Sequence, residues 1–178
     1  MSQPPHGLDL VIDFVNTLDL EKGADELVGH GLDDWFAGRE LRASDARPLD
    51  DRDRRQAMRL REALRTLMLA NNGGTSDDQA FGELEQIARR GELGIHFAPN
   101  GTVTLAPSSQ DFAGSLARLL VPVARASSDG TWLRVKACRA NDCHWAFYDR
   151  SRNRSGVWCE MAVCGNRTKV RAYRERTS

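Results

Sequence analysis

All four cysteines of this 178-residue chain lie in its last 41 residues, and no other feature of the sequence restricts the fold as strongly. They form two C-x4-C pairs, Cys138 with Cys143 and Cys159 with Cys164, and 15 residues separate the pairs. Close pairs about 15–20 residues apart are typical of a tetrahedral metal site, because each pair sits on a tight turn and the intervening residues form a hairpin that brings the turns together. Four thiolates favour zinc, so the spacing predicts one Zn²⁺ per chain.

Two other uses of the cysteines are open at this point. An iron–sulfur cluster also takes four thiolates, although a two-plus-two arrangement is more typical of zinc. Two disulfides are the other alternative, but the N-terminal residues lack the basic start of a secretory signal, so we expect a cytoplasmic protein, whose thiols stay reduced. His144 follows Cys143 directly, and we interpret it as structural because four cysteines already complete the tetrahedron.

The charges of the chain sum to zero but are unevenly distributed. Residues 134–178 contain 11 Lys and Arg against 4 Asp and Glu, a net charge of +7, which leaves −7 for residues 1–133. A basic segment that holds every cysteine indicates a module attached to an acidic body, and residues 127–130 (SSDG) have the composition of a linker. We therefore predict two domains, 1–130 and 131–178. The second is too short for a sufficient core, so zinc should supply its folding free energy.

The hydrophobic pattern of residues 1–130 predicts an α+β domain that is mainly helical. Helical spacing covers 8–18, 32–38, 49–70 and 112–123, the last with a bend at Pro122, and a capping box over 76–79 starts a helix that runs to Gly91. Asn100-Gly101 lies between alternating apolar residues and predicts one β-hairpin, and the C-terminal module adds a zinc-binding hairpin and a helix. We expect the first hairpin, through Ile95 and Val103, to pack beside one core formed by Leu60, Leu64, Leu67, Leu84, Ile87, Leu116 and Leu119.

Motifs of common enzymes do not occur in the sequence. It contains no nucleophile elbow, H-E-x-x-H, phosphate loop or G-x-G-x-x-G, so we do not expect an enzyme. It also contains no run of 18 apolar residues, so we expect no membrane partner. Asp13 and Asn16 lie on the polar stripe of the first predicted helix. We interpret them as capping or hydrogen-bonding residues, with contact to a small-molecule ligand as the alternative.

Two parts of the chain resemble known families. WCEMAVCGNR (158–167), preceded by FYDRSRNRS (147–155), resembles the CGNR zinc-finger signature, and LDLVIDFVNTLD (8–19) resembles the opening of the ABATE domain, which commonly precedes such a finger in bacterial proteins. The resemblance implies a transcription regulator with a nucleic-acid-binding C-terminus and an N-terminal domain that senses stress or a small ligand. Gly156 and Val157 depart from the family pattern, in which basic residues are expected. The zinc ligands that the resemblance implies are Cys138, Cys143, Cys159 and Cys164.

Basic residues of the C-terminal module are the candidate contacts to nucleic acid. Arg167, Arg171 and Arg174 recur at i, i+4 and i+7, which places them on one face of a predicted helix. Such a face can contact phosphates, or it can be a solvated helix end, and Arg167 can instead brace the metal knuckle. The residues that we predict to bind nucleic acid, duplex DNA above all, are Arg150, Arg152, Arg154, Arg167, Lys169, Arg171 and Arg174.

The function predicted from these features is zinc-dependent transcription regulation. Under this hypothesis the protein can also bind a small-molecule effector, and it can form a homodimer with a second copy of the chain. The main alternative is a zinc-stabilised module that docks an acidic protein surface without binding nucleic acid. Salt dependence of binding to duplex DNA separates the two.

Overall fold

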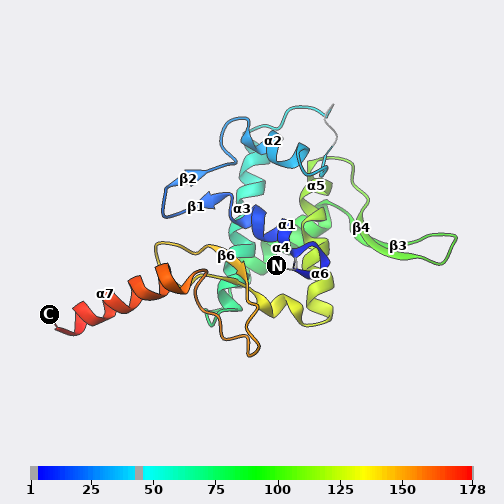
Figure 1. Ribbon diagram of the computed structural model, residues 1–178. Coiled ribbons are helices and arrows are strands. Elements are labelled where there is room, and N and C mark those ends of the chain that lie inside the picture. The colour runs from blue at the N-terminus through cyan, green and yellow to red at the C-terminus, as the bar shows by residue number, and fades with distance from the viewer. Residues whose placement is uncertain (1–3, 43–45, 178) are drawn as a thin grey trace.

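The computed structural model describes residues 4–42 and 46–177, and helices make up most of it (Figure 1). The α-helices are α1 Leu8–Val15, α2 Gly31–Ala37, α3 Asp51–Ala70, α4 Asp78–Arg90, α5 Phe112–Arg118, α6 Leu120–Ser128 and α7 Asn166–Thr177. Short 3-10 turns η1 Pro5–Gly7 and η2 Thr131–Arg134 and a π-helical turn η3 Met161–Gly165 adjoin them. The predicted fold class, α+β and mainly α, is confirmed.

The strands form three separate antiparallel pairs. These are β1 Leu18–Asp19 with β2 Ala24–Asp25, β3 Leu93–Phe97 with β4 Val103–Pro107, and β5 Val135–Ala137 with β6 Ala146–Tyr148. The β3–β4 pair is the predicted hairpin of the body, and β5–β6 belongs to the cysteine-rich segment. Among the described residues, none of the helices combines the length and the apolar character needed to cross a bilayer.

Helix α3 lies at the centre of the fold, and its sequence explains its start. The Asp50 carboxylate accepts hydrogen bonds from the backbone N–H groups of Arg52 and Asp53 at 2.8 and 3.0 Å. The Asp53 carboxylate accepts one from the Asp50 N–H at 3.1 Å, so two acidic residues form a reciprocal capping box. Helices α1 and α4 and strand β5 pack around α3, which makes it the element shared by the N-terminal and C-terminal parts.

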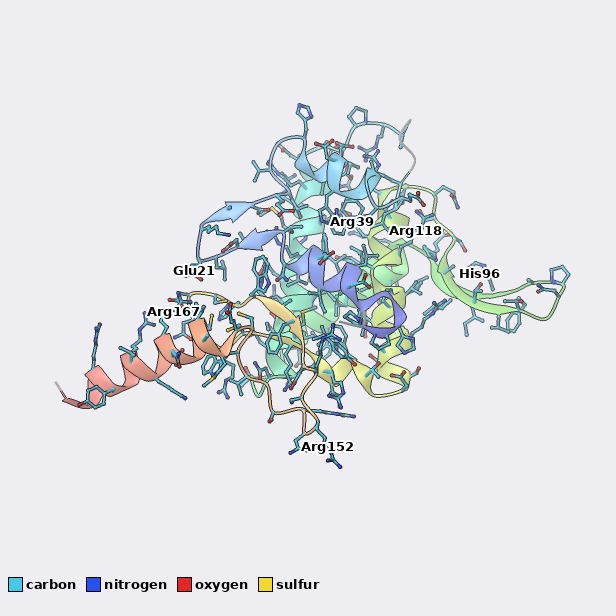
Figure 2. All side chains as sticks on the ribbon, in the orientation of Figure 1. Glu21, Arg39, His96, Arg118, Arg152 and Arg167 are labelled. Atoms are coloured by element: carbon cyan, nitrogen blue, oxygen red, sulfur yellow. The ribbon has the colours of Figure 1, made fainter. Side chains whose placement is uncertain are left out.

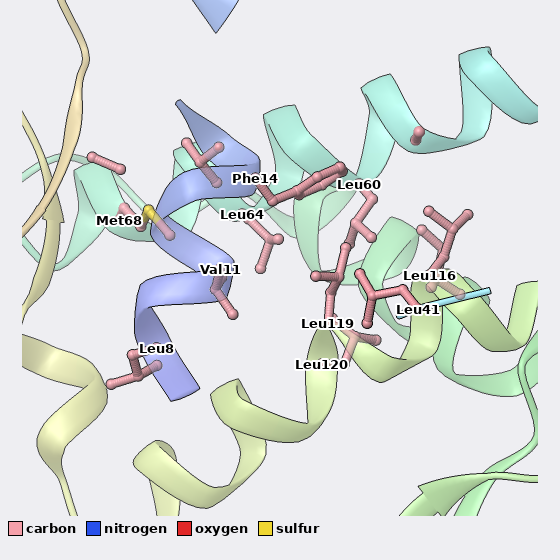
Figure 3. Packing of buried hydrophobic residues seen from close by; sticks show 14 of the residues in the cluster. Leu8, Val11, Phe14, Leu41, Leu60, Leu64, Met68, Leu116, Leu119 and Leu120 are labelled. Carbon is pink, nitrogen blue, oxygen red and sulfur yellow. The ribbon is translucent and has the colours of Figure 1, made fainter. Parts of the chain in front are cut away.

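The residues predicted for the core lie in one cluster or against it, although two of them are only partly buried. Leu8, Val11 and Phe14 of α1 meet Leu60 and Leu64 of α3 in one buried cluster, which Figure 3 shows from close by. The same cluster includes Ile87, Leu116 and Leu119, with Leu67 and Leu84 partly buried against it.

Two local features of the helices differ from the sequence prediction. The cap of α4 is Asp77, whose carboxylate accepts from the Gln79 N–H at 2.8 Å, because an aspartate one residue later displaces the predicted Ser76 cap. The helix predicted over 112–123 is two helices that meet at Leu119. Pro122 lacks the N–H that would bond the carbonyl of residue 118. The helix is therefore interrupted at Leu119, where we predicted a bend at Pro122.

The β3–β4 hairpin does not pack beside the core, which corrects our prediction. Ile95 and Val103 are 65% and 57% exposed, and the hairpin extends away from the helical body (Figure 1). Only its base is covered, through Leu93, which packs against the core. A strand pattern reports which side chains share a face but not whether another element covers that face, and this explains the error.

The start of the cysteine-rich segment shares the core of the helical body. Trp132, Val135, Ala137 and Ala146 are all buried in the same cluster as α1 and α3. The expectation that zinc alone folds the C-terminal module is therefore too simple for β5 and β6, since apolar burial also holds them. The predicted linker is the end of α6 and a tight turn at Gly130, where φ is 76°.

Replacing Leu64 with alanine should lower the free energy of unfolding by about 2–5 kcal/mol, because Leu64 is 0% exposed and the change leaves a cavity. Denaturant unfolding measures it. Met58→Ala on the exposed side of the same helix is the matched control and should change stability by no more than about 0.5 kcal/mol. Equal effects of the two substitutions would contradict the orientation of α3.

Candidate metal centre and basic surface

The four cysteines converge on one point. One Sγ atom from each of Cys138, Cys143, Cys159 and Cys164 lies within 4.8 Å of the others, and the Cys143–Cys159 and Cys159–Cys164 sulfurs are each 3.6 Å apart. Neighbouring sulfurs around a tetrahedral zinc ion with Zn–S bonds of about 2.3 Å would be about 3.8 Å apart. All four are free thiols rather than disulfides, so the donor set fits one four-coordinate Zn²⁺.

Backbone hydrogen bonds shape the first cysteine turn. The Cys138 N–H donates to the Trp145 carbonyl at 2.9 Å, directly after β5, and the Cys143 N–H donates to the Ala140 carbonyl at 3.0 Å. His144 then reverses the chain with a φ of 50° and leads into β6. The hairpin therefore flanks the first cysteine pair, whereas we predicted it between the pairs; β5 and β6 pair because both bury side chains in the core. His144 is not among the converging ligand residues, as expected.

The second cysteine turn is the π-helical turn η3. The N–H groups of Cys164 and Gly165 both donate to the Glu160 carbonyl, at 3.0 and 3.3 Å. Gly165 does not have a positive φ, but the space around it is tight, since a Cβ there would lie 2.4 Å from the sulfur of the flexible Met161 side chain and 3.0 Å from Trp158. Asn166 donates to the Ala162 carbonyl at 3.1 Å and continues the turn into α7.

Burial favours the neutral form of two of these thiols in the absence of a metal. It raises the pKa of the Cys143 thiol to about 12 and also raises that of Cys159. A zinc ion, when bound, supplies the positive charge that stabilises the four thiolates, and its binding adds to the free energy of folding. The protein's part is to hold the four sulfurs in position and to exclude water, since Cys138, Cys143 and Cys164 are buried.

A buried ion pair fixes the loop between the two cysteine pairs. The Lys136 ammonium, on a side chain that is almost fully buried, donates to the Asp149 carboxylate at 2.7 Å and to the carbonyls of Arg154 and Gly156 at 2.6 and 2.9 Å. Burial opposes ionisation of Asp149, but hydrogen bonds from Lys136 and Ser151 outweigh it and lower its pKa to about 2. The carboxylate therefore stays charged and holds one side of the loop.

Gly156 lies directly against the buried ion pair. Its N–H donates to the Asp149 carboxylate at 2.8 Å, and a Cβ at this position would lie 2.8 Å from the same carboxyl group. A basic residue at this position would therefore collide with the ion pair. Arg154, two residues earlier, adopts a φ of 54°, which its carbonyl contact with Lys136 stabilises.

The predicted nucleic-acid contacts fall into two exposed groups. One lies on the loop after β6, and Figure 2 shows Arg152 pointing away from the body there. The other lies on α7, which extends out from the finger (Figure 1). We call these exposed groups the loop cations, Arg150, Arg152 and Arg154, and the helix cations, Lys169, Arg171 and Arg174.

Arg167, the remaining predicted contact, binds acidic groups of this chain. Its guanidinium donates to Glu21 at 2.7 Å and lies 3.4 Å from an Asp142 oxygen (Figure 2). It also donates to the Cys164 sulfur at 3.6 Å. The ion pair with Glu21 raises the pKa of Arg167 above its usual range. Arg167 thus braces the metal knuckle in this structure.

Asp13 and Asn16 are not brought together at a cavity. The Asn16 amide donates to the Ala146 carbonyl at 3.0 Å and accepts from the Ala146 N–H at 2.7 Å, so it joins α1 to β6. Asp13 lies at the surface, but partial desolvation of its carboxyl group raises its pKa; the charge of Arg39 opposes this shift and that of Asp9 adds to it. A cavity of about 670 Å³ lies elsewhere in the body, and its lining includes Arg118 but neither Asp13 nor Asn16.

The residues that attach the finger to the body were not found from the sequence. Asn71 donates to the carbonyls of Trp132 and Val135, each at 2.9 Å. Asn72 donates to the carbonyls of Ala137 and Val157 at 2.8 and 2.7 Å. The sequence pattern indicated only that Asn71 and Asn72 end a helix, because their partners lie more than 60 residues away.

Buried arginines of α3 complete this attachment. Arg65 donates to the carbonyls of Val15 and His144 at 2.8 and 3.0 Å. Arg61 binds the Asp25 carboxylate through two bonds of 2.7 and 2.8 Å, which positions the β1–β2 turn that carries Glu21. An arginine at a helical core position is the only local signal for such a contact.

Comparison with protein families identifies two regions of the chain. Residues 8–129 match the family model ABATE, described as "putative stress-induced transcription regulator". Residues 134–177 match the family model of the CGNR zinc finger. No curated protein matches the chain.

The protein should contain one zinc ion per chain, measured by elemental analysis. Cys159→Ser should abolish tight zinc binding and remove hydrogen-exchange protection from 138–145 and 157–177, while β5 keeps its protection through the buried Val135 and Ala137. Ser155→Ala, an exposed change in the same loop, is the control. Iron in place of zinc, or collapse of the whole fold in Cys159→Ser, would refute this prediction.

Lys136→Met should lower the stability of the zinc-loaded protein by about 3–5 kcal/mol, because it leaves the Asp149 carboxylate buried without its partner. Denaturant unfolding at saturating zinc is the measurement. Arg139→Met, an exposed cation three residues along, should have an effect within about 0.5 kcal/mol. A loss below about 1 kcal/mol in Lys136→Met would mean that the ion pair does not hold the loop.

Proposed function

The chain belongs to the ABATE family and carries a CGNR zinc finger, and from this premise we propose that it regulates transcription by binding duplex DNA through the finger. Residues 1–130 would form the regulatory part and residues 131–178 the DNA-binding part. The finger binds one zinc ion through Cys138, Cys143, Cys159 and Cys164, and its role is structural.

The observation that carries the proposal is the exposed α7. This helix leaves the body directly after the last zinc ligand, Cys164, and extends into solvent (Figure 1). Lys169, Arg171 and Arg174 are exposed on it. A projecting cationic helix can enter a groove of DNA or follow the phosphate backbone, which a helix packed on the body could not do.

The loop cations supply a second set of contacts on a supported backbone. The Lys136–Asp149 ion pair and the αL conformation of Arg154 fix the loop, so less entropy is lost when its arginines bind phosphates. The body, in contrast, has a net charge of −7 over residues 1–133 and repels DNA. Binding is therefore confined to the finger.

The regulatory part could influence the finger through the Glu21–Arg167 ion pair. Glu21 lies on the β1–β2 turn, which Arg61 holds through Asp25, and Arg167 lies in the first turn of α7. A phosphate that binds Arg167 must replace Glu21 and Asp142. An effector that moves the β1–β2 turn would change the availability of Arg167, and Asp13 and Asn16 remain our candidates for contact with such an effector.

One observation favours the alternative of a protein-docking module. Arg167 already binds carboxylates of its own chain, which shows that an acidic protein surface can satisfy at least one cation of the finger. Under this alternative the loop cations and helix cations bind an acidic partner protein and not DNA. A direct binding experiment separates the two functions.

The test is a salt titration of the zinc-loaded full chain with duplex DNA. If about four phosphates are contacted, log affinity should fall against log salt with a slope of about −3.6. Replacing Arg171 and Arg174 with glutamine should weaken binding to all sequences and reduce the slope by about two units, since phosphate contacts carry no base information.

The control is a double variant of two exposed arginines of the body, Arg55→Gln and Arg90→Gln. It should leave the affinity for DNA and the slope of its salt dependence unchanged. No binding of the zinc-loaded chain at about 50 mM salt would reject DNA binding and favour the protein-docking alternative. Equal losses in the two double variants would show that net charge, and not the surface of α7, determines affinity.

A further inference from the structure

The β3–β4 hairpin carries no charged side chain other than a titratable histidine. Residues 93–107 (LGIHFAPNGTVTLAP) contain no Asp, Glu, Lys or Arg, whereas 28% of the chain is charged. Exposed β-ribbons usually carry charges or prolines along their strands, which prevent association with other chains. Within the strands this ribbon has only Pro107, at the end of β4. The segment therefore has the uncharged, apolar composition of a protein–protein interface, although it extends into solvent.

One face of the hairpin is apolar and uncovered. Ile95 pairs with Leu105 and Phe97 pairs with Val103, and side chains alternate along a strand, so these four lie on the same face. Ile95, Phe97 and Val103 are 65%, 78% and 57% exposed. The opposite face carries His96, labelled in Figure 2, and its cross-strand partner Thr104.

The hairpin is anchored at its base and closed by a defined turn. At the base, the Ser108 N–H donates to the Glu92 carbonyl at 3.2 Å, and Leu93 packs against the core. At the tip, the Gly101 N–H donates to the Ala98 carbonyl at 2.9 Å, and Gly101 has a φ of 81°. A two-stranded ribbon is marginal in water without a covered face. The apolar stripe thus continues from the core out to an uncovered tip.

We propose that this apolar face packs against the same face of a second copy of the chain, around a two-fold axis. A two-fold interface brings the same patch of both copies together, so any net charge on the patch would face an equal charge on the partner. The hairpin avoids this repulsion because it contains no Asp, Glu, Lys or Arg. The body as a whole is acidic, so other surface patches of two copies would repel each other. DNA is a poor occupant, since its phosphates require cations that the hairpin lacks.

The position of the hairpin on the body is compatible with pairing to a second copy. The hairpin and α7 leave the body on opposite sides, so pairing through the hairpins leaves the cations of α7 uncovered (Figure 1). The patch is small compared with the roughly 800 Å² per partner of a standard interface, so the dimer should dissociate reversibly at micromolar concentration. This inference does not depend on the proposed DNA binding.

The test is sedimentation of the zinc-loaded full chain across the micromolar range, compared with two variants. The wild type should show a monomer–dimer equilibrium. Phe97→Lys places one ammonium group from each copy in the apolar interface, where like charges are buried without partners, and should raise the dimer dissociation constant about 100-fold or more. Thr104→Lys adds the same charge to the opposite face of the same hairpin and should dimerise as the wild type does.

At concentrations low enough to keep the wild type monomeric, the helical circular dichroism and the unfolding midpoint of each variant should match the wild type, because both positions are exposed in the single chain. A wild type that is monomeric throughout the range would overturn the proposal, as would an equal effect of the two variants. Binding of a monomeric wild type to phosphatidylcholine vesicles would also overturn it and would assign the apolar face to lipid.

Discussion

The end of helix α3 determines where the zinc finger lies on the body. Asn71 and Asn72 each donate two hydrogen bonds to backbone carbonyls of the finger, and Arg65 bonds the carbonyl of His144 beside the first cysteine turn. The buried leucines of the same helix contribute to the core of the helical body. Helix α3 therefore supports both the helical body and the zinc finger. The position of the metal site is fixed by this rigid helix and not by a linker.

The sequence predicted those features that depend on local spacing. Cysteine spacing gave the ligand set, and helical periodicity gave the buried side of α3 through Leu60 and Leu64. Contacts over long sequence separations could not be read in this way. Asn16 looked like a polar residue on a surface stripe, but its amide matches the peptide group of Ala146, which only the folded chain brings close.

One error concerns which apolar strands the core covers. The strands β3, β4 and β5 are all short and apolar, and we expected the β3–β4 hairpin to pack beside the core. Ile95 and Val103 instead extend beyond it, whereas Val135 and Ala137 of β5 are buried against α3. Alternation of apolar residues shows which side chains lie together, but the covering element is set by tertiary packing.

Because η3 continues directly into α7, the geometry at the metal site determines the direction of α7. Cys164 lies within η3, and α7 begins two residues later without a hinge. Because α7 has 12 residues and is about 18 Å long, a tilt of about 10° at the sulfurs moves its far end by about 3 Å. That displacement is close to the rise of one base pair, so the angles at the zinc ion would set the register in which the helix meets any duplex.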